Sequence, residues 1–236
     1  NLAIAGIAVG TVSLPLLSKA IKIKNLKKIS TIQNKSIELS LLLSVPASLG
    51  LILASHEIIN ALFGYGSFSE KDINLTAQGL KFFGYGIPAF ALIKVLSNLF
   101  FARDNTKTPF YLSLFVVLIN IFVSLTYFKT IGFIIIPIAT SLSTWLGVIA
   151  YYVLLRNNQI LRFEKQTIKN IIKIIFSTLL MSTILIYGLD YFEESMNYLN
   201  KYKSIYLIFI VSFVGTIYLI SCYLLGVLKL KNYKTN

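Results

Sequence analysis

A lysine inside a long apolar run is the residue in this sequence best placed to do chemistry. Lys94 lies in the segment IPAFALIKVL, a few residues before Phe101, where the run ends. At a rise of ~1.5 Å per helical residue, Lys94 lies about 10 Å inside that boundary. A charge at such depth faces a polar cavity or a partner, so Lys94 is predicted to line a cavity and bind phosphate. The alternative is a side chain that reaches back to the lipid headgroups or pairs within the protein.

The other ionisable groups in apolar runs favour simpler interpretations. Lys81 and Lys173 lie near the ends of their runs, where their side chains are expected to reach the interface. His56 and Glu57 are adjacent, point to different faces, and are also expected at an interface. Paired acids, a Ser/His/Asp set, a phosphate-binding Gly loop and a metal-ligand cluster are absent from the sequence. Cys222 is the single cysteine and is expected to pack, so we predict no catalytic residue, metal site, cofactor or enzymatic activity.

Glycine and proline concentrate in the run that holds this buried lysine. Gly84, Gly86 and Pro88 lie within five residues of one another. Proline removes a backbone hydrogen bond and bends a helix, and bent helices recur in transporters with moving halves. These three residues are therefore a candidate hinge. Gly6 and Gly10 have the spacing of close helix–helix contacts, which is a common and weak pattern.

Composition indicates that membrane-spanning helices position these residues. Apolar residues form 56% of the chain and charged residues 13%, and the polar residues fall in short clusters between long apolar runs. Roughly 20 apolar residues cross a bilayer core, and helices satisfy their own backbone groups there. The sequence predicts an all-α polytopic bundle. It has a partial span at residues 2–17 and six complete spans at residues 38–62, 73–101, 110–128, 131–155, 170–192 and 204–228.

The distribution of basic residues predicts the orientation of these spans. Most of the 22 Lys and Arg residues fall in alternate loops, at residues 18–37, 102–109 and 156–169, and in the tail after residue 228. By the positive-inside rule that side is cytoplasmic, and the carboxyl terminus with it. The net charge of +13 does not indicate nucleic-acid binding, because the basic residues alternate with apolar runs instead of forming a patch on a soluble fold.

The lysine-rich segment 18–37 has a pattern of its own. Ile21, Leu26, Ile29 and Ile32 recur near helical spacing among the lysines. This predicts a helix lying on the inner membrane surface, held by anionic headgroups. The alternative is a solvated loop.

Several segments carry a common signature in order along the chain. Residues 92–109 read LIKVLSNLFFARDNTKTP, and residues 8–18, 45–51, 61–68 and 139–145 read AVGTVSLPLLS, VPASLGL, ALFGYGSF and ATSLSTW. In order and spacing these resemble segments of the MurJ/MviN family of lipid II flippases, over about residues 3–156. The last two spans fit the family by position and hydrophobicity alone.

The resemblance implies membership of the multidrug/oligosaccharidyl-lipid/polysaccharide exporter superfamily, with fourteen helices in two lobes. Residues 1–155 would form part of the second lobe, from the end of the eighth helix to the twelfth. Residues 156–236 would form the carboxyl-terminal helix pair, which helps to form a groove for the lipid tail, and a cytoplasmic tail. The implied activity is movement of lipid II, an undecaprenyl-pyrophosphate-linked peptidoglycan precursor, from the inner to the outer leaflet of the bacterial inner membrane by alternating access. Lys94 would be a cavity cation for the pyrophosphate, and Arg103 would shape the cytoplasmic gate.

The implied partners are lipid II or a related polyprenyl-pyrophosphate lipid, membrane lipids, and an amino-terminal lobe outside this sequence. The chain opens at Asn1 within an apolar run, so we expect it to be part of a longer protein. One departure from the family is Tyr65-Gly66, which stands where the family has Arg-Gly. Any role of that arginine's charge is therefore not expected of Tyr65. The alternatives are a flippase for another polyprenyl-linked saccharide and a non-transporting membrane remnant or scaffold.

Overall fold

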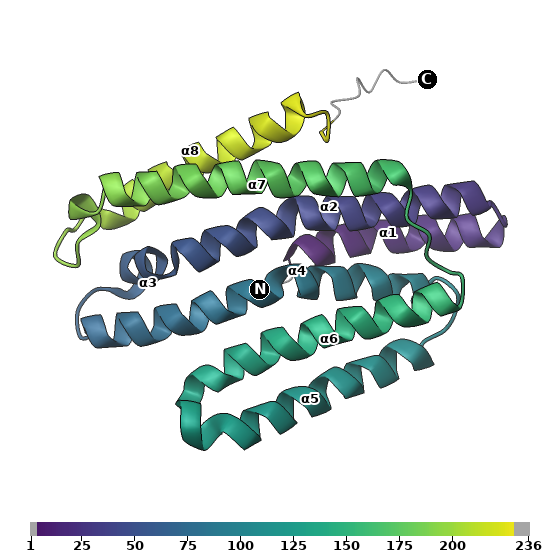
Figure 1. Ribbon diagram of the computed structural model, residues 1–236, viewed down its shortest axis with the longest axis horizontal. Coiled ribbons are helices and arrows are strands. Elements are labelled where there is room, and N and C mark those ends of the chain that lie inside the picture. The colour runs from purple at the N-terminus through teal and green to yellow at the C-terminus, as the bar shows by residue number, and fades with distance from the viewer. Residues whose placement is uncertain (1–3, 229–236) are drawn as a thin grey trace.

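The computed structural model describes residues 4–228 as an elongated bundle of helices that lie side by side (Figure 1). The helices are α1 (Ile4–Lys22), α2 (Leu26–Leu53), α3 (Ser55–Phe63), α4 (Glu70–Phe101), α5 (Lys107–Ile131), α6 (Ile135–Asn157), α7 (Lys165–Tyr191) and α8 (Lys203–Leu224), with short 3-10 turns η1 (Gly132–Ile134) and η2 (Glu194–Met196). Every regular element among these residues is helical, which confirms the predicted all-α class. The predicted cytoplasmic tail after residue 228 lies outside the described residues.

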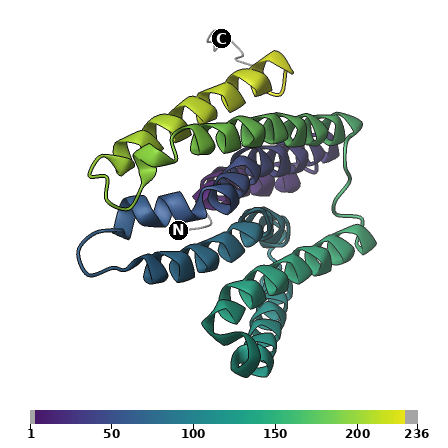
Figure 2. The same ribbon diagram turned by 60° about the vertical axis from the view of Figure 1, so that its left-hand side comes forward.

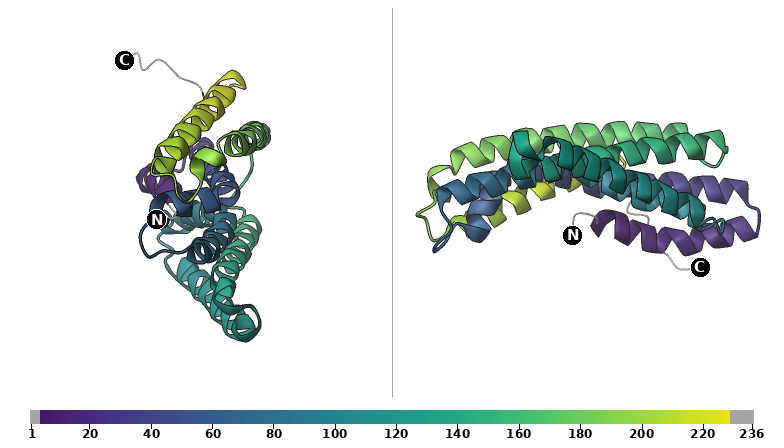
Figure 3. Two further views of the ribbon diagram at one scale, coloured as in Figure 1. Left: turned by 90° about the vertical axis from the view of Figure 1, so that its left-hand side faces the viewer. Right: turned by 90° about the horizontal axis from the view of Figure 1, so that it is seen from below.

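The long helices form a row in the order α8, α7, α2, α4, α6, α5, in which each helix packs on the next. The end-on view in Figure 3 shows this row, and α1 packs against both α2 and α4. Figure 2 shows α7 and α8 along one edge and the α5–α6 hairpin along the other. Five stretches are long and apolar enough to cross a membrane, and one of them, Lys107–Asn157, contains both α5 and α6. The predicted spans from residue 73 onward thus each correspond to a long helix.

Local sequence signals set the ends of these helices. The side chain of Asn25 accepts a hydrogen bond from the Lys28 N–H and caps α2. Ser69 and Asp72 form a reciprocal capping box at the start of α4. The chain reverses between α5 and α6 at Gly132, whose φ of 75° suits a residue without Cβ. The connections fall alternately at the two ends of the bundle, as Figure 1 shows and as alternating spans require.

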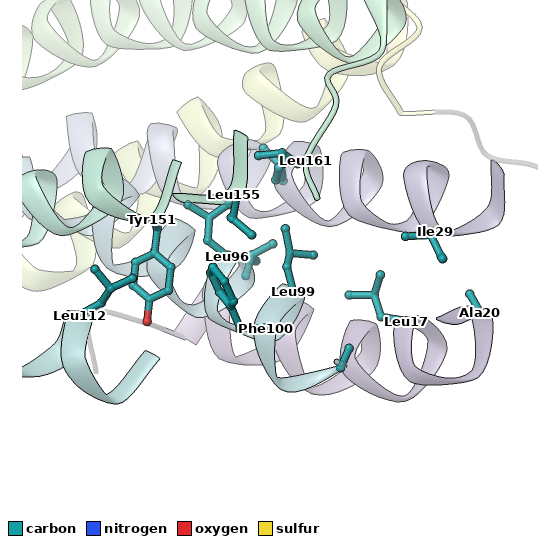
Figure 4. Close-up of a cluster of buried hydrophobic side chains, with 13 residues drawn as sticks. Leu17, Ala20, Ile29, Leu96, Leu99, Phe100, Leu112, Tyr151, Leu155 and Leu161 are labelled. Carbon is teal, nitrogen blue, oxygen red and sulfur yellow. The ribbon is translucent and has the colours of Figure 1, made fainter. Parts of the chain in front are cut away.

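One of two large buried clusters lies where α1, α2, α4, α5 and α6 meet (Figure 4). Leu99 and Leu155 are fully buried there, and the rings of Phe100 and Tyr151 lie 6.0 Å apart. Leu161, from the linker between α6 and α7, covers the cluster. This core joins the helices at one end of the row into a single packed unit.

Two predictions about local structure are wrong. Residues 18–37 are neither a surface helix nor a loop: they are the end of α1, a tight turn and the start of α2. Ile29 packs in the same cluster as Leu17, and Ile21 and Ile32 pack against it, so three of the four apolar residues cover protein, whereas Leu26 is exposed. The predicted span at residues 38–62 is also interrupted, because α2 ends at Leu53 and the separate helix α3 begins at Ser55.

Candidate functional site

The predicted cavity cation, Lys94, lies on α4 where that helix crosses α1. Its side chain is exposed, and among the described residues its ammonium group has no hydrogen-bond or ion-pair partner. A Cβ built on Gly10 of α1 would lie 3.3 Å from the Lys94 Cγ, so the lysine stem lies across the glycine. The charge is therefore carried on the surface beside the α1–α4 contact and is open to an anionic ligand.

The α1–α4 contact that supports Lys94 is unusually close. A Cβ on Gly6 would lie 2.6 Å from the Cα of Ala91, which leaves no space for a side chain. The buried amide of Asn98 donates to the Gly10 carbonyl at 2.8 Å and lies 3.4 Å from the hydroxyl of Ser13. The weak glycine pattern of the sequence thus marks a real helix contact, in which small residues and an interhelical hydrogen bond act together.

Arg103 lies apart from Lys94, in the corner between α4 and α5. Its guanidinium donates to the Leu99 carbonyl at 2.6 Å, which places a cation on the carboxyl-terminal end of α4. Burial lowers the pKa of Arg103, yet a guanidinium stays charged at neutral pH. Arg103 and Lys94 share no hydrogen-bond partner, and the geometry gives Arg103 the role of closing a helix end.

The rest of the ARDNTKTP segment also builds this corner. Asp104 has a φ of 59°, a left-handed conformation that acidic and amide residues tolerate in turns. The Asn105 N–H donates back to the Phe100 carbonyl at 3.1 Å, and the Asn105 side chain accepts from the Thr108 N–H at 3.1 Å. The segment that carries much of the family resemblance is therefore a connection that fixes how α4 turns into α5.

The candidate hinge lies at the middle of α4, against α2 on one side and α6 on the other. Because Pro88 has no N–H, the Gly84 carbonyl loses its usual helical donor. The hydroxyl of Ser48, on α2, donates to that carbonyl at 2.7 Å. Neighbouring helices commonly satisfy freed backbone groups in membrane helices in this way.

Two further α4 carbonyls near Pro88 accept hydrogen bonds from α6. The Ser141 hydroxyl donates to the Phe82 carbonyl at 2.6 Å, and the Trp145 indole donates to the Tyr85 carbonyl at 2.9 Å. Gly86 lies so close to α6 that a Cβ there would be 2.7 Å from the Ser141 Oγ. The candidate hinge is therefore held from both sides in this conformation.

A buried lysine near the start of α8 was missed by the sequence reasoning, which placed it in a loop. Lys203 is 1% exposed, and its ammonium donates to the Asn60 Oδ1 at 3.0 Å and to the carbonyls of Gly64 and Tyr198 at 2.6 and 2.9 Å. The same Nζ lies 4.2 Å from the ring centroid of Tyr65 and 4.9 Å from that of Tyr198. Only its position at the edge of an apolar run could have suggested burial. Lys203 ties α8 to the end of α3.

A largely apolar groove of about 460 Å³ lies between α2, α7 and α8. Pro46, Ala47 and Gly50 line its α2 side, and Val214 and Gly215 line its α8 side. The proline and glycines leave space that larger side chains would fill. The groove has the chemistry of a site for a hydrocarbon chain.

A cavity of about 660 Å³ lies between α3, the start of α4 and the end of α7. Its lining includes Glu57, Glu70, Asp190, Glu193 and Glu194. Among the described residues no three His, Cys, Asp or Glu side chains form a group that could hold a metal ion. The cavity is acidic in character, opposite in charge to the basic loops at the other end of the bundle.

The row of spanning helices defines a multi-pass membrane protein, and the exposed cation and the apolar groove are candidate sites on it. The family model "Lipid II flippase MurJ" matches residues 1–208. The chain therefore belongs to the MurJ family, a family of transporters, and is a multi-pass protein of the bacterial inner membrane.

Individual relatives agree with this assignment. The "Probable lipid II flippase MurJ" of Rickettsia prowazekii is 33% identical over 225 residues, which cover 93% of this chain and 44% of the relative. The protein of the same description from Thermotoga maritima is 35% identical over 187 residues, covering 78% of this chain and 36% of the relative. The solved structure "Lipid II flippase MurJ, inward closed conformation" matches with a TM-score of 0.77 at 25% identity, over 94% of this chain and 43% of that one. The chain spans less than half the length of these relatives.

Proposed function

We propose that this chain forms the carboxyl-terminal part of a lipid II flippase. Residues 1–155 contribute to the second lobe, and residues 156–236 contribute the carboxyl-terminal helix pair and a cytoplasmic tail. The observation that carries the proposal is the family match over residues 1–208 together with the fold match over 94% of the chain. The protein acts as a transporter, with no catalytic step of its own.

In this function Lys94 holds the pyrophosphate of the lipid. Its ammonium is exposed and without a counter-ion among the described residues, while the Gly10 contact fixes the stem that carries it. A single lysine binds phosphate as a point charge, so further cations come from the lobe outside this chain. Asn98 acts as a positioning residue, because its amide joins α4 to α1 beneath Lys94.

The lipid tail occupies the apolar groove between α2 and the α7–α8 pair. The groove runs beside the lobe and its lining is largely apolar, as a polyprenyl chain requires. Arg103 supports the cytoplasmic gate by fixing the end of α4. Gly84, Gly86 and Pro88 supply a bend in α4 whose freed carbonyl is satisfied from α2. The basic loops and the carboxyl terminus face the cytoplasm.

A fusion protein tests the proposal, because alternating access needs two lobes. The amino-terminal part of the Rickettsia prowazekii relative is joined to this chain and expressed in cells depleted of their own flippase. We expect growth to be restored, to be lost with Lys94→Met, and to persist with Lys81→Met, an exposed lysine on the same helix. Immunoblotting of membranes checks that the variants accumulate equally.

The outcomes separate the alternatives. If the fusion with Lys94→Met supports growth as well as the unchanged fusion does, Lys94 is not part of the binding site. Failure of every well-expressed fusion would favour a non-transporting remnant. A leaflet assay that compares the movement of lipid II with that of an O-antigen precursor identifies the cargo. If the O-antigen precursor moves preferentially, the cargo is another polyprenyl-linked saccharide and not lipid II.

A further inference from the structure

A small polar pocket of about 230 Å³ lies at the end of the bundle that carries the basic loops. Three segments line it: the first half of α2 from Thr31 to Glu38, the start of α7, and the turn Gly226–Val227 after α8. It thus lies where the lobe, the linker and the carboxyl-terminal helix pair meet. In the proposed orientation this is the level of the inner-leaflet headgroups.

The wall of this pocket is fixed by buried hydrogen bonds. Asn34, which is 2% exposed, donates to the Arg162 carbonyl at 2.8 Å and accepts from the Glu164 N–H at 3.1 Å. The Ser30 hydroxyl donates to a Glu164 carboxylate oxygen at 2.8 Å. The linker before α7 is therefore attached to α2, and the start of α7 is held in one place.

One side of the pocket offers hydrogen-bond donors. Thr167 is 3% exposed, lines the pocket, and has no hydrogen-bond partner for its hydroxyl among the described residues. Asn170 is 7% exposed, and its carbonyl oxygen accepts from Gln166 at 3.0 Å, which leaves its amide NH₂ without a partner in the same part of the chain. The first-turn N–H groups of a long helix lie beside them, at the positive end of its dipole. Lys35, on α2, adds a cation to the lining, so these groups together suit phosphate oxygens.

The pocket also carries negative charge. Glu38, on α2, and Glu164, at the N-cap of α7, both line it, and neither has a Lys or Arg nitrogen within ion-pair distance among the described residues. These carboxylates would repel a purely anionic headgroup. A group that carries both a phosphate and a primary ammonium complements the donors and the carboxylates at once.

We propose that this pocket binds the phosphoethanolamine headgroup of an inner-leaflet phospholipid. The pocket is smaller than the ~300 Å³ at which ordinary ligand sites begin, which suits a headgroup whose acyl chains remain in the bilayer. The bound lipid bridges α2, α7 and the turn after α8, and so fastens the carboxyl-terminal pair to the lobe. The proposal rests on the inner-leaflet orientation and is independent of the cargo that the flippase moves.

Native mass spectrometry of the 236-residue chain in detergent tests this site, with phosphatidylethanolamine and phosphatidylglycerol of equal chain length as probes. We expect preferential retention of phosphatidylethanolamine. Thr167→Val should weaken it about tenfold, because one hydrogen bond to a charged group is lost. Thr183→Val, an exposed threonine on the same helix, is the matched control. Glu38→Gln should weaken phosphatidylethanolamine binding and leave phosphatidylglycerol binding equal or stronger.

The Tm of each variant is measured without added lipid. If it equals the Tm of the unchanged chain, the fold is retained and a loss of binding is assigned to the site. Equal retention of the two lipids, or equal weakening by Thr167→Val and Thr183→Val, would overturn the proposal. The last measurement is the binding of soluble glycerophosphoethanolamine, which has the same headgroup and no acyl chains. Binding as tight as that of the lipid would show that the site takes a free metabolite, and would equally overturn a lipid site.

Discussion

Replacement of Lys203 by methionine tests how α7 and α8 are held at the end of the bundle that carries α3. The substitution keeps the length and apolar stem of the side chain and removes its charge. It deletes three hydrogen bonds, to Asn60, Gly64 and Tyr198, and two contacts with tyrosine rings. The relief of the ammonium's own desolvation, several kcal/mol, is offset by the loss of these hydrogen bonds and ring contacts.

The net effect depends on what remains after the substitution. Three oxygen acceptors stay buried without their donor, at about 1–3 kcal/mol each. Taking the low end for all three gives a loss of about 3 kcal/mol. At roughly 2–4 °C per kcal/mol for a chain of this length, the Tm should fall by about 6–12 °C. Lys203→Arg should restore little of this, because the site holds a compact ammonium among three oxygens and a guanidinium is planar and larger.

The chain carries its own reporter for this measurement. Cys222 is the single cysteine and is buried in α8, so a thiol-reactive dye that fluoresces on coupling records unfolding as the temperature rises. Hydrogen exchange over residues 193–207 locates the change, and we expect lost protection there. The control is Lys201→Met, an exposed lysine two residues earlier. If Lys203→Met and Lys201→Met melt together and exchange alike, the reasoning about this cation is refuted.

Three further predictions concern the middle of the lobe and the chain as a whole. Gly86→Ala should destabilise the protein by about 1–3 kcal/mol through overpacking against α6, whereas Gly79→Ala on the same helix, with open space around it, should be neutral or stabilising in thermal unfolding. Ser48→Ala should cost about 1–3 kcal/mol by leaving the Gly84 carbonyl without a donor. That cost should shrink in a Pro88→Ala background, which returns a helical N–H, and equal costs in both backgrounds would contradict this account. Residues 1–236 expressed alone should fail to restore growth to flippase-depleted cells, and rescue would show that the chain transports without a second lobe.

Much of the architecture follows from the sequence because a spanning helix depends on local composition. A run of apolar residues long enough to cross the bilayer must be a helix wherever it lies, so the spans could be placed without any tertiary information. The ends of the helices depend on capping residues and helix breaks, which composition alone does not show. The Ser69–Asp72 capping box extends α4 beyond its apolar part, and the break at Ala54 divides a run that reads as continuous.

The errors share a physical cause. The spacing of Ile29 and Ile32 shows that one face of the segment is apolar, but not whether lipid or another helix covers it. Here α1 covers it. Lys203 reads as a loop residue because a charge at the edge of a span usually is one, and its burial depends on oxygens that Asn60 and Gly64 supply from a distant part of the chain. Long-range pairing of this kind leaves no local signal.

The contacts of α4 bear on where movement can occur in a flippase built from this chain. Gly10 and Asn98 join α4 to α1, Ser48 joins it to α2, and Ser141 joins it to α6. Bending at Pro88 would have to break the hydrogen bonds from Ser48 and from Ser141 at once. Release of Ser48 would leave the Gly84 carbonyl without a donor, because Pro88 has no N–H to supply one. The Phe82 carbonyl would keep its helical donor, the Gly86 N–H, when Ser141 leaves. Movement of the packed helices as one body breaks none of these bonds. In the proposed flippase this favours rocking of these helices together against an amino-terminal lobe, and a bend in α4 would first require release of Ser48.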